Sequence, residues 1–282
     1  MAWRAAVKIA YDGRQFMGSQ RQPGGCTVED EVIRCLRKIK AIESPEKARF
    51  RTASRTDRGV SALGNVVAFD TSFDMDHLLQ ALNSQSDSVF FLGLAKVPAS
   101  FSPRRAQQRW YRYFHPIGGI DVERLRSALE LFEGDHDFKR FCKPEGRETT
   151  RRIESIEAFP LGEFVVIDFR AREFLRNLIR RIVAASALVG KGKATLDDVR
   201  EALEGKERSF GLAPSEDLVL VDVEYPFDFE GDTGPALARR IAARRREAFI
   251  GLVLVSGMEG MLGPADARVA KGLSRHGGVS GP

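Results

Sequence analysis

Apolar and polar residues alternate over several short segments of the chain, a pattern typical of β-strands. Continuous apolar runs of similar length, bounded by glycine, proline or aspartate, indicate strands that are buried on both faces. Strands are predicted over Val7–Tyr11, Asn65–Asp70, Val89–Ala95, Arg109–His115 and Leu218–Glu224, and a hairpin from Ile153–Phe159 and Phe164–Arg170 with Pro160-Leu161-Gly162 in its turn.

Other segments carry apolar side chains three and four positions apart, which is the spacing of one helix face. Helices are predicted from Thr27 to Ile39 and over Met75–Leu82, Asp121–Phe132, Glu173–Leu188 and Thr195–Leu203. Thr27, Asp121 and Thr195 are suited to cap the helices that they begin. Gly190 is suited to end the long helix that precedes it.

Strands and helices are mixed in both halves of the chain, and they do not alternate regularly enough for a Rossmann or barrel fold. Pro98 and Pro103 bracket a connecting loop. We place a boundary there, between an N-terminal half of residues 1–102 and a C-terminal half of residues 103–282.

Composition favours a soluble protein with an anionic partner. The 282 residues suffice for one large domain or two small ones, and an apolar content of 43% is ordinary for a globular protein. The net charge is +5, and 33 arginines stand against 11 lysines. Because a guanidinium binds phosphates and stacks on bases, this bias favours a nucleic-acid partner. Genome composition or adaptation to heat would produce the same bias.

Cysteine and histidine usage predicts neither a metal site nor a disulfide framework. Cys26, Cys35 and Cys142 are odd in number and form no Cys-x-x-Cys pair, and the four histidines are scattered. We expect no metal, no cofactor and a reducing, cytoplasmic location. The N-terminus lacks the apolar stretch of a signal peptide. The run Phe249–Leu262 is too short to span a membrane, so a core helix or strand is expected there, followed by a partly mobile tail from Arg268.

The most informative segment runs from Ser54 to Gly64 and leads directly into a predicted strand. It places Asp57 between Arg55 and Arg58 in a glycine-bearing loop. Cations that close keep a carboxylate ionised, and an ionised aspartate without metal partners is a candidate nucleophile or base. An ordinary turn aspartate beside solvated arginines would show the same charge pattern.

This loop resembles the catalytic loop of the tRNA pseudouridine synthase A family, which has the pattern Arg-Thr-Asp-x-Gly-Val-x-Ala. Here the pattern runs from Arg55 to Ala62. Four further family motifs follow the same order along the chain: Tyr11-Asp12-Gly13 with Phe16–Gln22, Arg109–Tyr113, Gly134–Phe141, and Phe174–Val183. Three positions depart from the family pattern, because Ser19 replaces a tryptophan and Ala184 and Asp217 each replace a glycine.

The resemblance implies a pseudouridine-synthase fold of the α+β class. This fold has two halves, each with a mixed, mostly antiparallel sheet flanked by helices, and an active-site cleft between them. The implied reaction detaches uracil from C1′ of uridine, turns the base and rejoins it through C5, without a metal or a cofactor. The family modifies the anticodon stem-loop of tRNA around positions 38 to 40, and its members are homodimers without a membrane association.

Residue roles follow from the same resemblance. Asp57 is the expected nucleophile or base, and Arg180 is expected to orient it and keep it ionised. Tyr111 is expected to stack on the uracil and to take part in proton transfer at C5. Arg55 is expected to fill the space that a flipped base leaves.

Three further expectations complete the assignment of side chains. Arg58 and Arg109 are expected to bind the substrate, together with Arg55. His136 is expected to pack or cap rather than to act as a base.

Two other classes of function are compatible with parts of the sequence. A non-catalytic RNA-binding protein or RNA chaperone would explain the arginine content, but it would need none of Asp57, Tyr111 and Arg180. A carboxylate-using hydrolase would normally require a second catalytic carboxylate or a metal cluster, and neither occurs at a convincing spacing.

Overall fold

The computed structural model describes residues 2–143, 145–146, 148–232 and 234–259. The strands are β1 (Trp3–Tyr11), β2 (Arg51–Thr52), β3 (Ser61–Thr71), β4 (Val89–Val97), β5 (Gln108–Pro116), β6 (Gly134–Asp137), β7 (Thr150–Ile153), β8 (Ser155–Leu161), β9 (Phe164–Ala171), β10 (Leu218–Glu224) and β11 (Glu230–Gly231). The helices are the 3-10 turn η1 (Gly13–Gln15) and α1 (Val28–Lys38), α2 (Met75–Asn83), α3 (Val122–Glu130), α4 (Leu178–Gly190), α5 (Leu196–Leu203) and α6 (Pro235–Glu259).

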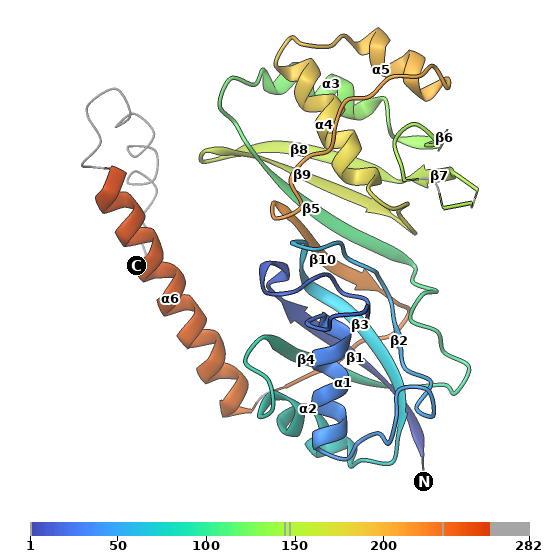
Figure 1. Cartoon of the computed structure of the whole chain (residues 1–282), viewed down its shortest axis with the longest axis vertical. Helices are drawn as coiled ribbons and strands as arrows, with labels where there is room; N and C mark the ends of the chain where they lie inside the picture. The colour runs from blue at the N-terminus through green and yellow to red at the C-terminus, as the bar shows by residue number, and fades with distance from the viewer. Residues whose placement is uncertain (1, 144, 147, 233, 260–282) are drawn as a thin grey trace, which may run out of the picture.

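Nine strands form one continuous sheet that runs through both halves of the molecule (Figure 1). The order is β11-β4-β1-β3-β10-β5-β9-β8, with β2 paired to β3, and a separate hairpin joins β6 to β7. The class is α+β with a mixed, mostly antiparallel sheet, as the sequence predicts. Each half contributes a set of strands, as expected. The two sets join along β3 and β10 and so form one sheet rather than two.

The fusion is a short parallel contact between β3 and β10, in which Val219 faces Ser61 and Leu220 faces Ala62. All other strand pairs of the large sheet are antiparallel. Beyond this contact the two strands come very close at Gly64, where a Cβ atom would lie 2.5 Å from Asp222 Oδ1. A side chain at this position would therefore push the two halves apart.

Helices cover the sheet in each half (Figure 1). α1 and α2 lie on the N-terminal half, whereas α3 and α4 pack against one another on the C-terminal half. The predicted caps are confirmed, because Thr27 and Thr195 both form capping boxes and Asp121 accepts hydrogen bonds from two backbone N–H groups of α3. These caps satisfy donors that a helix start otherwise leaves unpaired.

The long helix begins five residues later than the sequence predicts. Asn177 has a left-handed backbone (φ 67°), so residues 173–177 form a loop and α4 starts at Leu178. At the other end, Gly190 is still the last residue of α4. It packs closely on Ile120, since a Cβ atom at position 190 would lie 3.0 Å from the Ile120 side chain. Gly192, with φ 68°, follows the helix and provides the stop that was assigned to Gly190.

The C-terminal helix α6 corrects the expectation of a core element over Phe249–Leu262. Its base is anchored by Arg240, which donates hydrogen bonds to Asn83 and to the carbonyl oxygen of Val89. One turn further, Arg244 Nη2 donates to Asp87 O at 3.3 Å. Beyond Arg244 the helix projects away from the body (Figure 1), and the side chain of Phe249 is 65% exposed. The end of the run at 260–262, like the tail from Arg268, lies outside the described residues. Within the described part of the chain, no helix is long and apolar enough to cross a bilayer.

Candidate active site

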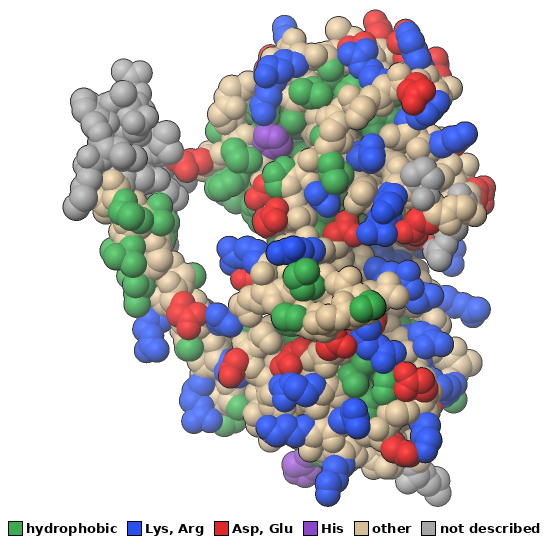
Figure 2. Space-filling model, in the orientation of Figure 1, with side chains coloured by type: hydrophobic (Ala, Val, Ile, Leu, Met, Phe, Trp, Pro, Cys, Tyr) green, Lys and Arg blue, Asp and Glu red, His purple; other side chains and the backbone are tan. Residues whose placement is uncertain are grey.

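A cleft of about 890 Å³ opens between the two halves of the molecule. Its volume lies in the range of sites that enclose a small ligand. Figure 2 shows Lys and Arg side chains gathered along the boundary between the two halves. The basic side chains that line the cleft are Arg21, Arg55, Arg58, Arg104, Arg109, Lys143, Arg151, Arg176 and Arg180. A wall of this composition favours an anionic ligand.

The loop that carries Asp57 is a tight turn pressed against η1. Val60 N donates to Asp57 O at 3.2 Å, and Gly59 takes the left-handed conformation with φ 90°. Gly13 lies so close to the loop that a Cβ atom would be 2.1 Å from Val60 O. The Tyr11-Asp12-Gly13 motif therefore serves as a backing for this loop, which explains the requirement for glycine at position 13.

Two arginines contact the Asp57 carboxylate from the opposite wall of the cleft. Arg180 Nη1 lies 3.5 Å from Asp57 Oδ2, and Arg176 Nε lies 3.7 Å from Oδ1. The Asp57 side chain is about one-third exposed. The structure thus brings together Asp57 and Arg180, which are 123 residues apart in sequence, as the family pattern leads us to expect. Both contacts pair the carboxylate with a group of opposite charge.

The two arginines differ in how firmly they are held. Arg180 Nε donates to Ala213 O at 2.7 Å, and only 14% of its side chain is exposed. Arg176 is about half exposed and also contacts Glu145 Oε1 at 3.3 Å. Arg176 is a site residue that the sequence analysis missed. It occupies a variable position of the Phe174–Val183 motif, and it reaches Asp57 because the left-handed Asn177 turns the chain before α4 begins.

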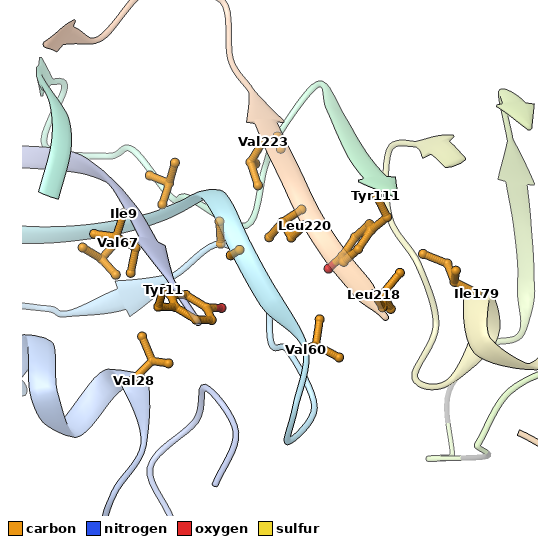
Figure 3. Packing of buried hydrophobic residues seen from close by; sticks show 14 of the residues in the cluster. Ile9, Tyr11, Val28, Val60, Val67, Tyr111, Ile179, Leu218, Leu220 and Val223 are labelled. Atoms are coloured by element: carbon orange, nitrogen blue, oxygen red, sulfur yellow. The ribbon is translucent and has the colours of Figure 1, made fainter. Parts of the chain in front are cut away.

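Tyr111 projects from β5 over the neighbouring strand β10, beside Leu218 and Leu220 (Figure 3). It lines the cleft but is only 7% exposed, and its ring stands edge-on to that of Phe174 with 5.3 Å between centroids. Burial raises the pKa of the Tyr111 phenol, and the nearby Arg109 charge offsets this only in part. The phenol is therefore neutral at neutral pH.

The three arginines expected to bind substrate occupy different environments. Arg55 and Arg58 are exposed at the cleft, and within the described residues neither forms a hydrogen bond or ion pair with protein. Arg109 is 7% exposed, and its guanidinium donates to protein oxygens on several sides. Arg109 still lines the cleft, so its part in substrate binding stays a prediction.

A buried hydrogen-bond network supports the loop from below. Tyr11 Oη and Thr56 Oγ1 are 2.8 Å apart, and Asn65 Nδ2 donates both to Tyr11 Oη and to Ser54 O. Ser54 N in turn donates to Asn65 Oδ1. Because burial makes an unpaired polar group costly, a network this complete holds one loop conformation. His136, as expected, packs, with its ring against Phe138 and Nε2 2.8 Å from Glu133 O.

The described residues contain no group of three or more His, Cys, Asp or Glu side chains placed to hold a metal ion. The chemistry that the cleft can offer is that of a carboxylate between two arginines, beside a buried neutral phenol and under a basic rim. This arrangement is typical of an enzyme that acts on a phosphate-bearing ligand by nucleophilic or acid–base chemistry.

Comparisons with known proteins identify the class more closely. The sequence model of the family described as tRNA pseudouridine synthase matches residues 128–226. The chain is 41% identical over 259 residues to the tRNA pseudouridine synthase A of Pyrococcus abyssi, covering 89% of this chain and 97% of that protein. It is 43% identical over 243 residues to the protein of the same name from Thermococcus kodakarensis, covering 84% and 91%.

These relatives place the protein among the pseudouridine synthases, which are isomerases. The chain belongs to the tRNA pseudouridine synthase A family. Among solved structures, it is similar to a chain of a Cbf5-Nop10-Gar1 complex at 17% identity and a TM-score of 0.35, over 65% of this chain and 45% of that one. The family assignment rests on the sequence relatives.

Proposed function

We propose that this protein isomerises uridine to pseudouridine in the anticodon stem-loop of tRNA, at positions 38 to 40, with Asp57 as the catalytic carboxylate. The observation that carries the proposal is the contact of Asp57 with both Arg176 and Arg180 inside a basic cleft. In this isomerisation the bond between N1 and C1′ breaks and a bond between C1′ and C5 forms. C5 loses one proton and N1 gains one, so neither an oxidant nor a metal is required.

Each side chain has a distinct task in this proposal. Asp57 acts as the nucleophile or base, and Arg180 fixes its orientation and its charge. Tyr111 lies at the wall where a detached base must be held. Because its phenol is neutral, it serves by contact with the base and by hydrogen bonding rather than as a phenolate. Arg55, exposed at the rim, fills the stack when a base is flipped into the cleft, and Arg58 binds the backbone.

The same proposal covers the protein's organisation and surroundings. The halves 1–102 and 103–282 form the two walls of the cleft, although β11 near the end of the described chain returns to pair with β4 of the first half. The protein acts in the cytoplasm as a homodimer, so that one tRNA contacts both subunits.

The test is to map pseudouridine in tRNA transcripts incubated with the purified protein, by carbodiimide treatment followed by primer extension. Wild-type protein should produce stops at positions 38 to 40. Asp57→Asn should produce none, with tRNA affinity within about tenfold of wild type, or roughly 1.4 kcal/mol. Asp197→Asn is the matched control, since Asp197 is exposed on α5, pairs with Arg200, and does not line the cleft.

Three outcomes would contradict the proposal. Normal turnover by Asp57→Asn would remove this carboxylate from the mechanism. Primer-extension stops only at other positions would show that the enzyme modifies a different part of the tRNA. Tight tRNA binding by wild-type protein without any stops would favour the non-catalytic RNA-binding protein instead.

A further inference from the structure

Arg109 is a buried cation without an anionic partner. It is 7% exposed, and within the described residues its guanidinium forms no ion pair with a carboxylate. Its neighbours include two tyrosines, Tyr111 and Tyr225, whose pKa values burial raises and the Arg109 charge lowers in part. Burying a charge among such groups is costly unless its hydrogen bonds are well satisfied.

The guanidinium of Arg109 is satisfied by four oxygens from three separate segments. Nε donates to Ser54 Oγ at 2.9 Å, and Nη2 donates to Ala53 O and to Arg104 O, each at 3.1 Å. Nη1 donates to Arg172 O. Three of these four acceptors are backbone carbonyls. The guanidinium therefore holds the backbone of these segments in place, in addition to the side chain of Ser54.

Each of the three segments carries part of the cleft. Ser54 lies three residues before Asp57 in the loop. Arg104 belongs to the connection between β4 and β5, and it lines the cleft itself. Arg172 begins the loop between β9 and α4, which continues to Arg176, the second arginine on Asp57. One side chain thus joins the wall that holds the carboxylate to the wall that holds its arginine partner.

We propose that Arg109 is a positioning residue that sets the distance of Asp57 from the facing wall, an inference that rests on the proposed catalytic role of Asp57. A planar fork with donors in several directions is needed to hold three chain segments together, and the ammonium of a lysine cannot reproduce it. Since a displacement of about 1 Å at a reacting group can cost on the order of 100-fold in rate, loosening this junction should slow the chemical step much more than it weakens tRNA binding.

The experiment measures the single-turnover rate and the tRNA dissociation constant of Arg109→Lys. The rate should fall on the order of 100-fold while the dissociation constant stays within about threefold of wild type. The matched control is Arg112→Lys. Arg112 lies on the same strand but on its other face, and it donates two hydrogen bonds of 2.8 Å to Asp168. The control should lose comparable thermal stability but little of its single-turnover rate.

Ser54→Ala provides a second variant, which removes one acceptor of the Arg109 guanidinium and also the hydroxyl that acts on the Tyr111 phenol. It should lower the rate by roughly tenfold or less, again without a change in affinity. If both side chains act through one junction, the double variant should be no slower than Arg109→Lys alone. Should Arg109→Lys fail to fold, Ser54→Ala is compared in the wild-type and Tyr111→Phe backgrounds. A loss of single-turnover rate in both backgrounds, with tRNA affinity unchanged, supports the inference, and a loss confined to the wild-type background contradicts it.

Several results would overturn the inference. A tRNA affinity that falls while the single-turnover rate is kept would make Arg109 a substrate contact. An unchanged single-turnover rate in Arg109→Lys would show that Arg109 is a structural residue without a positioning role. The same conclusion would follow if Arg109→Lys and Arg112→Lys lost equal amounts of single-turnover rate. Wild-type protein that forms no pseudouridine would instead refute the proposed function itself, so the two failures are distinguishable.

Discussion

Ser19 and Thr56 form a reciprocal pair of hydrogen bonds that holds the Asp57 loop in place. Thr56 N donates to Ser19 Oγ at 2.8 Å, and Ser19 N donates to Thr56 O at 3.1 Å, although the two residues are 37 positions apart. Ser19 is 2% exposed. It stands where the family usually has a tryptophan, so a hydrogen-bonded clamp here takes the place of a large packed ring.

Arg180→Lys should slow the single-turnover rate far more than Arg181→Lys. The guanidinium of Arg180 donates a hydrogen bond from Nε to Ala213 O and contacts Asp57 through Nη1. The ammonium of a lysine cannot make both contacts. Losing one charge-assisted hydrogen bond of about 1.5–3 kcal/mol corresponds to roughly 10- to 100-fold in rate. Equal single-turnover rates for the two variants on the same tRNA would contradict the role of Arg180 in orienting Asp57.

Gly13→Ala should distort the active-site loop and lower both stability and rate. An added Cβ would lie 2.1 Å from Val60 O, where neither backbone can yield easily. Overpacking of this kind costs about 1–3 kcal/mol, which thermal unfolding will show. Gly118→Ala is the control, because a Cβ at that position meets nothing within 4 Å. A Gly13→Ala protein as stable and as active as the control would contradict the proposed backing of the loop.

The pH dependence of the rate should show no ionisation of Tyr111 in the physiological range. Burial raises the pKa of this phenol above its ordinary value near 10. The neutral form is therefore present at all pH values below that, and a phenolate base would be almost absent at pH 7. Single-turnover rates should be measured from pH 6 to 9 for wild type and Tyr111→Phe. An inflection near pH 8 that disappears in the variant would refute this prediction.

Asp168→Asn should lower stability at neutral pH and much less in acid. Burial opposes ionisation of Asp168. The hydrogen bonds and charge of Arg112, together with other polar neighbours, outweigh it and hold the pKa of this carboxyl below its usual value. A depressed folded-state pKa gives stability that is present above the unfolded pKa of about 3.9 and lost as pH falls through the folded one.

At pH 7 we therefore expect the Asp168→Asn variant to lose about 1–3 kcal/mol, or roughly 2–12 °C in Tm. Thermal unfolding at pH 7 and at the lowest pH that keeps the protein folded will measure the difference. A gap between variant and wild type that does not shrink in acid would show that the loss comes from packing and not from the charge.

Arg55→Ala should reduce turnover on folded tRNA more than on a short unstructured fragment that contains uridine. Arg55 is exposed at the rim of the cleft, where it can fill the gap of a flipped base. Flipping costs a few kcal/mol in a stacked stem and least in a single strand. Rates on both substrates should be compared with those of Arg58→Ala. Equal losses on the two substrates together with a shifted pH profile would mean that Arg55 acts on the charge of Asp57 instead.

The sequence by itself determined the class of fold, most elements and the identity of the central carboxylate. Period-two and period-3.6 patterns reflect which faces are buried, and helix caps such as Thr27 and Thr195 act within four residues, so local sequence is sufficient to predict them. Asp57 was recognisable because a short loop motif stays contiguous in sequence.

The family motif predicted Arg180 beside that carboxylate, but only the tertiary structure decided that Arg176 contacts it as well. Arg176 reaches Asp57 because Asn177 turns left-handed before α4, and no periodicity signals such a turn. Arg109 shares a strand face with Tyr111, and four oxygens from segments distant in sequence accept hydrogen bonds from its guanidinium. The fusion of the two sheets at Ser61 and Val219 likewise depends on contacts between segments far apart in sequence, which the pattern within any one segment does not contain.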